Sequence, residues 1–374
     1  MGVPYWLEDD LPVRVEPRVD GRADVAIVGA GVTGCAAALR LAEAGLRVRV
    51  HEQRRIAEGA SGRNGGFALT GGATLYDVAR ETYGAEAARE LWHWTEEALE
   101  RMEPIAGDAI RRTGSYRLAV DEEERDQIRC EYEALREDGF DAEWLDEVPG
   151  PRGHLFLAAV HHPHDATIQP ARFVRRLAAR AAEAGAEIRE HDEVRDVEAL
   201  DADNVVVATD GYGHGLVAEL SDLIWPTRGQ VIATAPLRER LFEKPHYARQ
   251  GFDYWQQLED GRLVLGGFRD VSIMDELTDV EETTPAIQES LERFAGELVG
   301  EPPQVTHRWA GIFGLTQDFL PLVGRVPGRD RLWVAAGYSG HGNIPGFACG
   351  ELVAGAILGR PSPQLELLDP ARFG

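Results

Sequence analysis

The stretch ADVAIVGAGVTG, residues 23–34, decides the fold of this chain. It begins with an apolar run and continues with three glycines in the spacing GxGxxG. The next residues, CAAALRLAEAG, carry apolar side chains at helical spacing up to a glycine stop at Gly45, and LRVRVHE then alternates like a strand that ends at Glu52. Together these segments predict a βαβ unit of about 30 residues, which is the size that such a crossover needs.

The glycines of this unit predict a dinucleotide site. Gly29 lets the chain turn sharply, Gly31 lets the backbone approach a pyrophosphate, and Gly34 lets the helix pack on the strand. The N-terminus of the helix favours negative charge, and a carboxylate at Glu52 can accept hydrogen bonds from an adenosine ribose. An ordinary βαβ turn without a nucleotide is the alternative, and GxGxxG alone does not separate NAD from FAD.

The rest of the chain predicts an α/β protein (α+β overall). Residues 170–185 are typical of an amphipathic helix, 204–211 and 332–337 of buried strands that meet loops, and 226–275 of antiparallel sheet with a hairpin turn at Asp260-Gly261. We therefore predict a Rossmann-like cofactor-binding domain with an inserted antiparallel-sheet substrate domain. The first is assigned residues 1–80, 150–222 and 320–374, and the second residues 81–149 and 223–319.

The composition favours a cytoplasmic enzyme that acts on a small molecule. The three cysteines, Cys35, Cys130 and Cys349, lie far apart and outside any CxxC pattern, so we expect neither a disulfide scaffold nor a metal site. The net charge of −25 disfavours nucleic acid, because binding to phosphates needs a basic face. No run reaches the roughly 18 apolar residues of a membrane span, and the N-terminus lacks the pattern of a signal peptide.

Further motifs lie outside the βαβ unit. They are an opening Tyr5-Trp6, GASGRNGG at 59–66, ATDGY at 208–212, RGQ at 228–230, DGRLVLGG at 260–267, FLPLVG at 319–324 and GYSGHG at 337–342. Together they resemble the D-amino-acid-oxidase-like (DAO) family of FAD-dependent oxidoreductases over nearly the whole chain. Within that family the chain looks most like the branch that includes gamma-glutamylputrescine oxidoreductase. The resemblance implies that the dinucleotide is FAD.

The resemblance also implies which residues hold FAD. They are Gly29, Gly31, Val32, Thr33, Gly34, Glu52 and Gln53 of the βαβ unit; Ala60, Ser61, Arg63, Asn64, Gly65 and Gly66; Val194, Ala208, Thr209 and Gly211 on the adenosine side; and Gly337, Ser339, Gly340, His341, Gly342 and Asn343. The last group would stabilise the anionic reduced flavin through N–H groups, although His341 could instead be a structural histidine bonded to backbone. We expect non-covalent FAD, because 309–319 has no cysteine where the sarcosine-oxidase branch carries one and 59–66 has no histidine.

The implied reaction is oxidation of a carbon–nitrogen bond in a small primary or secondary amine, or in an amino acid. The α-hydrogen of the neutral amine would pass as hydride to flavin N5, water would hydrolyse the imine, and O2 would be reduced to H2O2. Two alternatives stay open: a dehydrogenase that passes electrons to a quinone or carrier, and a flavoprotein with a structural FAD and a binding role. The sequence leaves the oligomeric state open.

The candidate catalytic residues are Arg63, Tyr254, Trp309 and His341. Aromatic residues of the inserted sheet are candidates for the pocket wall, with core packing as the alternative: Tyr116, Trp225, Tyr247, Phe252, Tyr254, Trp255, Trp309 and Phe313.

Two departures from the family pattern concern the substrate. Glycine and D-amino-acid oxidases carry a carboxylate-binding arginine where this chain has Gly311-Ile312-Phe313-Gly314, so an α-amino carboxylate is less expected unless another arginine replaces it. The candidates for that replacement are Arg63, Arg228, Arg269 and Arg308. The lysine that helps oxygen to react in the sarcosine branch falls at Val264 here, and Lys244 is the only lysine of the chain.

Overall fold

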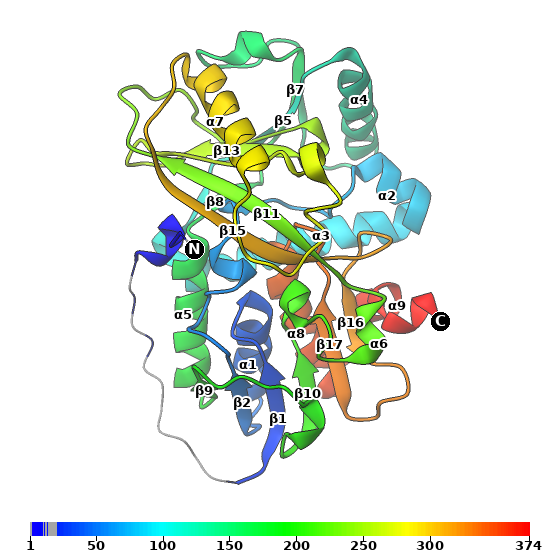
Figure 1. The fold of residues 1–374 in the computed structure, drawn as a ribbon. Coiled ribbons are helices and arrows are strands. Elements are labelled where there is room, and N and C mark those ends of the chain that lie inside the picture. Colours follow the sequence, from blue (N-terminus) through cyan, green and yellow to red (C-terminus); the bar gives the residue numbers. More distant parts are fainter. Residues whose placement is uncertain (1, 10, 12, 14–20) are drawn as a thin grey trace.

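Two large sheets dominate the computed structural model, which describes residues 2–9, 11, 13 and 21–374 (Figure 1). A six-stranded sheet carries the N-terminal βαβ unit, and an eight-stranded sheet lies above it in the view of Figure 1. No helix in the described part of the chain is long and apolar enough to cross a membrane.

The six-stranded sheet confirms the βαβ prediction. Its order is β16 (Leu322–Arg325), β17 (Leu332–Ala336), β10 (Ala202–Val207), β1 (Ala23–Val28), β2 (Val48–His51) and β9 (Glu187–Arg189). All neighbours pair in parallel except β16, which pairs antiparallel with β17 at the edge. All of β1 except Asp24 is buried, and so is the apolar run 205–207 of β10, as in the apolar strands of a covered parallel sheet.

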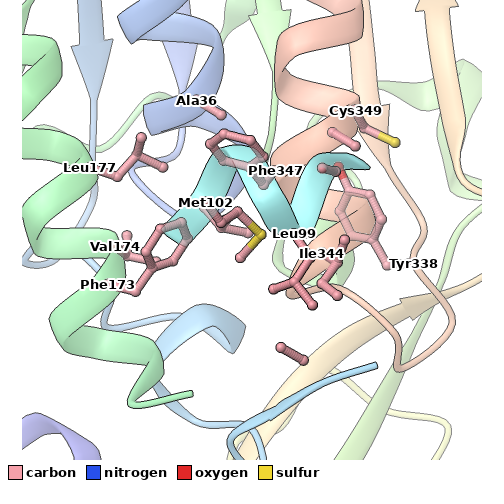
Figure 2. Close-up of a cluster of buried hydrophobic side chains, with 14 of the residues drawn as sticks. Ala36, Leu99, Met102, Phe173, Val174, Leu177, Tyr338, Ile344, Phe347 and Cys349 are labelled. Carbon is pink, nitrogen blue, oxygen red and sulfur yellow. The ribbon is translucent and has the colours of Figure 1, made fainter. Parts of the chain in front are cut away.

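Four helices form the core beside this sheet. They are α1 (Val32–Glu43), α3 (Ala85–Ala106), α5 (Pro170–Glu183) and α8 (Ile344–Ile357), and they pack against one another. Figure 2 shows their side chains meeting in one apolar cluster, among them Ala36, Leu99, Met102, Phe173, Leu177 and Phe347. Because α1 is fixed between α5 and α8, its N-terminus has a defined position at the end of β1.

The eight-stranded sheet confirms the antiparallel prediction for residues 226–275. Its order is β15 (Val305–Leu315), β11 (Trp225–Thr234), β14 (Leu263–Gly267), β13 (Asp253–Gln257), β12 (His246–Ala248), β5 (Ser115–Ala119), β7 (Ala158–His162) and β6 (Glu143–Leu145). Only β12 and β5 pair in parallel. The helix α7 (Pro285–Val299) packs on β11 and β14, and α4 (Glu122–Glu137) packs on β5 and β7.

The strands cross the boundary that we predicted at residue 150. The strand β7 lies in the range 150–222, which we assigned to the cofactor domain, but it pairs with β5 of the eight-stranded sheet. A small sheet of β3 (Phe67–Ala68), β8 (Ala166–Ile168) and β4 (Ile110–Arg112) also joins both ranges. The division into two domains stays a prediction, and β7 belongs with the substrate part of it. The remaining helices are α2 (Tyr76–Tyr83), α6 (Ala218–Ser221) and α9 (Pro363–Leu368).

Candidate cofactor and substrate site

One large cavity has walls from both sheets. Its volume is ≈ 1120 Å³, which is above the roughly 300–1,000 Å³ of most ligand pockets. One end is lined by the loops that follow β1, β2 and β10, and the other by residues of β12, β13 and α4. The cavity is therefore large enough for an extended cofactor and a second small molecule.

All but four of the predicted cofactor residues line this cavity. They are Gly29, Gly31, Val32, Thr33, Glu52, Gln53, Ala60, Ser61, Arg63, Asn64, Gly65, Val194, Ala208, Thr209, Ser339, Gly340, His341, Gly342 and Asn343. The exceptions are Gly34, Gly66, Gly211 and Gly337, which pack against the chain behind the cavity. A Cβ atom on Gly211, for example, would lie 2.5 Å from the carbonyl oxygen of Phe313.

The turn between β1 and α1 is packed too tightly for side chains. Gly29 has φ +103°, and a Cβ atom there would lie 2.7 Å from the carbonyl oxygen of Ala208. A Cβ atom on Gly31 would lie 2.9 Å from Oγ of Ser61, which accepts a hydrogen bond from Val32 N at 3.0 Å. The backbone at the start of α1 is thus open to the cavity, as the binding of a pyrophosphate requires.

Glu52 holds its carboxylate at the end of β2. One oxygen accepts from Ala30 N at 2.8 Å and the other from Arg54 N at 2.9 Å. Burial raises the pKa of Glu52, and these two backbone donors oppose that rise. The carboxylate is fixed at the cavity wall, where it fits an adenosine ribose.

The two glycine-rich segments 59–66 and 337–343 are joined by hydrogen bonds. The side-chain amides of Asn64 and Asn343 exchange two hydrogen bonds of 3.2 and 3.1 Å. Trp6, which is buried, donates from its indole nitrogen to the carbonyl oxygen of Asn64 at 2.7 Å. Segments far apart in the sequence therefore form one wall of the cavity.

Asp210 is a site residue that the sequence analysis missed. Its carboxylate accepts from the backbone nitrogens of Gly314 at 3.0 Å and Gly337 at 2.8 Å, and it lines the cavity. Burial raises the pKa of this carboxyl group, whereas the backbone donors lower it. Asp210 joins the ends of β10, β15 and β17, and its position directly after a buried strand was the available signal.

Arg63 lines the cavity, but all of its nitrogens have partners. It donates to the carbonyl oxygens of Glu58 at 2.7 Å and Ala310 at 3.2 Å, and it forms an ion pair with Glu281 at 3.1 Å. Glu281, whose side chain is 3% exposed, also pairs with Arg54 at 3.0 Å. The sequence analysis missed Glu281, because its segment 268–284 has no regular pattern. The guanidinium nitrogens of Arg63 thus already have partners within the protein, and a catalytic role of Arg63 stays a prediction.

Half of the predicted aromatic wall faces the cavity. The lining residues are Tyr247, Phe252, Tyr254 and Phe313, whereas Tyr116, Trp225, Trp255 and Trp309 lie elsewhere. Trp309 is 1% exposed and donates from its indole nitrogen to the carbonyl oxygen of Arg63 at 2.8 Å. Trp309 therefore packs behind the cavity wall, and its catalytic role stays a prediction.

His341 lies beside a tyrosine and two arginines. Its Nε2 is 3.4 Å from the hydroxyl oxygen of Tyr247. Burial lowers the pKa of His341 to about 4, and the charges of Arg117 and Arg269 add to that effect, so the imidazole is neutral near pH 7. Arg117, which the sequence analysis missed, lines the cavity and forms an ion pair with Glu131 at 3.1 Å.

The other sequence candidates lie outside the cavity. Arg228 and Arg308 are in ion pairs, at 2.7 Å with Glu276 and at 2.8 Å with Glu292. Val264 is buried in the eight-stranded sheet, and Lys244 donates from Nζ to the carbonyl oxygen of Thr113. Of the four arginines proposed as a carboxylate clamp, only Arg63 and Arg269 line the cavity.

Comparison with known proteins gives consistent matches. Residues 24–356 match the model of the DAO family, which is described as FAD dependent oxidoreductase. The chain is 30% identical over 370 residues to the gamma-glutamylputrescine oxidoreductase of Escherichia coli (strain K12), covering 90% of this chain and 84% of that protein. It is 29% identical over 407 residues to the probable oxidoreductase OrdL of Rhizobium meliloti (strain 1021), covering 98% and 91%.

Solved structures share the fold. The crystal structure of glycine oxidase from Geobacillus kaustophilus matches with a TM-score of 0.76 and 23% identity, covering 94% of this chain and 99% of that chain. The crystal structure of L-proline dehydrogenase from P. horikoshii matches with a TM-score of 0.77 and 22% identity, covering 95% and 98%.

Proposed function

The chain belongs to the DAO family of FAD-dependent oxidoreductases, and on that premise we propose that it oxidises the carbon–nitrogen bond of a small amine or amino acid. The observation that carries the proposal is the single cavity that runs from Glu52 to the aromatic wall of Tyr247 and Tyr254. It joins a place for a dinucleotide to a place for a small organic molecule. The names of two relatives, gamma-glutamylputrescine oxidoreductase and glycine oxidase, agree with an amine substrate.

The residues that would hold FAD fit its chemical groups. The open backbone at Gly31 suits the pyrophosphate, the carboxylate of Glu52 suits the ribose, and the joined segments 59–66 and 337–343 suit the ring system. When bound, FAD would supply the two-electron oxidation of the substrate carbon next to nitrogen, with O2 as the final acceptor of the two electrons and H2O2 as the product. We propose that FAD binds without a covalent bond to the chain.

The contribution of the chain itself would be positioning and exclusion of water. The substrate loses a hydride from carbon and a proton from nitrogen, and water hydrolyses the resulting imine to a carbonyl compound and an amine or ammonia. Tyr247, Tyr254 and Phe313 would hold the amine with aromatic surface. Neutral His341 adds no positive charge near the substrate, so it does not disfavour an amine that approaches this wall.

The test is anaerobic reduction of the flavin. The purified FAD-loaded protein is mixed with a panel of amines and amino acids, and the flavin absorption near roughly 450 nm is followed. We expect one class of amine to bleach the flavin, and we expect H2O2 when air is readmitted. A reduced flavin that air does not reoxidise would favour the dehydrogenase alternative, and a protein that takes up no FAD would overturn the proposal.

A further inference from the structure

Arg269 has no acidic partner among the described residues, although it lines the cavity. Its guanidinium carbon is 4.6 Å from the ring centre of Phe252 and 5.8 Å from that of Phe313. Its nitrogens form no hydrogen bond or ion pair with the part of the chain that the structure describes. The neighbouring Asp270 pairs with Arg249 instead, at 2.8 Å. A guanidinium held against aromatic rings with its donors open to a cavity is arranged to bind an anion.

Two tyrosine hydroxyl groups share this part of the wall. The hydroxyl of Tyr254 has no hydrogen-bond partner among the described residues, and that of Tyr247 has only the long contact of 3.4 Å with His341. Burial raises the pKa of both tyrosines, and the charge of Arg269 opposes that rise. Both hydroxyl groups therefore keep their protons near pH 7 and are available to donate.

Arg117 lines the same cavity as Arg269, but its positive charge is compensated by acidic side chains of the protein. Its Nε lies 3.1 Å from the buried carboxylate of Glu131, and Asp77 adds a second acidic group close by. The charge of Arg117 is thus compensated within the protein. The acidic group that acts on Arg269 is Asp270, which forms an ion pair with Arg249, so a bound anion would stabilise the half-buried positive charge of Arg269.

We infer that Arg269 binds a carboxylate of the substrate, and that the substrate is an amine that also carries a carboxylate group. The statement about the substrate rests on the proposed function. A carboxylate can accept two parallel hydrogen bonds from a guanidinium and a further one from Tyr254. Arg269 lies in the segment after β14. The stretch 311–314, where glycine and D-amino-acid oxidases have their arginine, has none in this chain and contributes the aromatic ring of Phe313 beside the guanidinium of Arg269.

The first test measures binding without any reaction. The FAD-loaded protein is titrated with acetate and with its neutral counterpart acetamide, and affinity is read from calorimetry and from the shift of the flavin spectrum. We expect acetate to bind at least ~10-fold more tightly than acetamide, and Arg269→Met to remove that preference. Arg269→Lys should recover part of it. Arg308→Met is the matched control, because Arg308 pairs with Glu292 outside the cavity.

The second test links the anion site to the substrate. Amines with a terminal carboxylate, from glycine to longer amino acids, are compared with alkylamines of equal chain length in anaerobic flavin reduction. We expect the carboxylated member of a pair to reduce the flavin faster in the wild type, and Arg269→Met to remove the advantage while FAD content and Tm stay unchanged.

Two results would overturn the anion site at Arg269: equal affinity of the wild type for acetate and acetamide, or acetate affinity that survives in a folded Arg269→Met variant. If no amine reduces the flavin but acetate binds through Arg269, the proposed function fails and the anion site stands. If alkylamines react as fast as their carboxylated partners in the wild type, the proposed function stands and the substrate class is wrong.

Discussion

The two ends of the cavity differ in how their polar groups are satisfied. At the cofactor end, Glu52, Asp210 and Arg63 all have partners within the protein. At the substrate end, the guanidinium of Arg269 and the hydroxyl of Tyr254 have none among the described residues. The cofactor end is therefore already held in shape by the fold, whereas the substrate end keeps donors that a ligand can use. Substitutions should separate the two ends by their effect on stability.

The largest loss is expected where the turn of the cofactor end is most crowded. A Cβ atom on Gly34 would lie 1.9 Å from the carbonyl oxygen of Gly29, so Gly34→Ala must displace the turn from α1. We expect a loss of about 3 kcal/mol in the free energy of unfolding together with loss of bound FAD. Urea unfolding and flavin content measure both. Gly355→Ala is the control, because a Cβ atom there has only Arg360 Cβ at 4.0 Å; an equal loss in both variants would contradict the crowding argument.

This crowding is also the part of the site that could be predicted from the sequence. The spacing of Gly29, Gly31 and Gly34 sets a local backbone geometry, and Glu52 follows within the same βαβ unit, so short-range reasoning was enough. Asp210 and Glu281 act on segments more than fifty residues away along the chain, at Gly314 and Arg54. No local pattern specifies such a partner.

The aromatic wall shows a second limit of prediction. Tyr254 and Trp255 are neighbours on β13, and successive side chains of a strand point to opposite faces. Tyr254 lines the cavity, whereas Trp255 is fully buried in the core. The alternation implies that only one of the two side chains can face a ligand, but it does not identify the face of the sheet that lines the cavity. Local pattern does not predict the pairing of β7 with β5 either, since the two strands lie far apart in the sequence.

A smaller loss is expected from removing the charge that pairs with Arg54 and Arg63. Glu281→Gln leaves two arginines near the cofactor end without their shared carboxylate. We expect the protein without FAD to lose about 2 kcal/mol of unfolding free energy, and the FAD-loaded protein to lose less, because the cofactor brings negative phosphates to this end. Chemical unfolding of both forms measures the difference. Glu292→Gln, which frees the more exposed Arg308, is the control. Equal losses in the FAD-free and FAD-loaded forms would mean that the phosphates of FAD do not lie near Arg54 and Arg63.

A comparable effect is expected from pH, through His341. Burial lowers the pKa of His341 to about 4 from the usual 6.5 of a histidine, so the unfolded chain takes up a proton at higher pH than the folded protein. The stability that neutral His341 provides is therefore complete above about pH 6.5 and is lost as the pH falls toward 4. His341→Asn should lessen the decline in unfolding free energy between pH 6.5 and 5 by up to about 2 kcal/mol.

The control for this pH dependence is His93→Asn, whose imidazole is half exposed and pairs with Glu96 on the surface. It should leave the decline unchanged. His246 and His162 are buried with lowered pKa values as well, so the unfolding free energy declines with falling pH in every variant. The test is therefore the difference in this decline between variants. If the decline is unchanged in His341→Asn, this imidazole takes up its proton at the same pH in the folded protein as in the unfolded chain, and its pKa is not lowered.

The smallest effect on stability is expected at the substrate end. Tyr254→Phe removes a hydroxyl group that has no partner among the described residues, so the free energy of unfolding should change by less than about 0.5 kcal/mol. Trp309→Phe is the matched variant behind the wall: it removes the hydrogen bond of 2.8 Å to Arg63, and we expect a loss of about 1 kcal/mol. Ligand binding should give the reverse order, with weaker acetate binding in Tyr254→Phe and unchanged binding in Trp309→Phe. A Tyr254→Phe variant that unfolds more easily than Trp309→Phe would mean that the hydroxyl stabilises the fold, and the contrast between the two ends of the cavity would then be wrong.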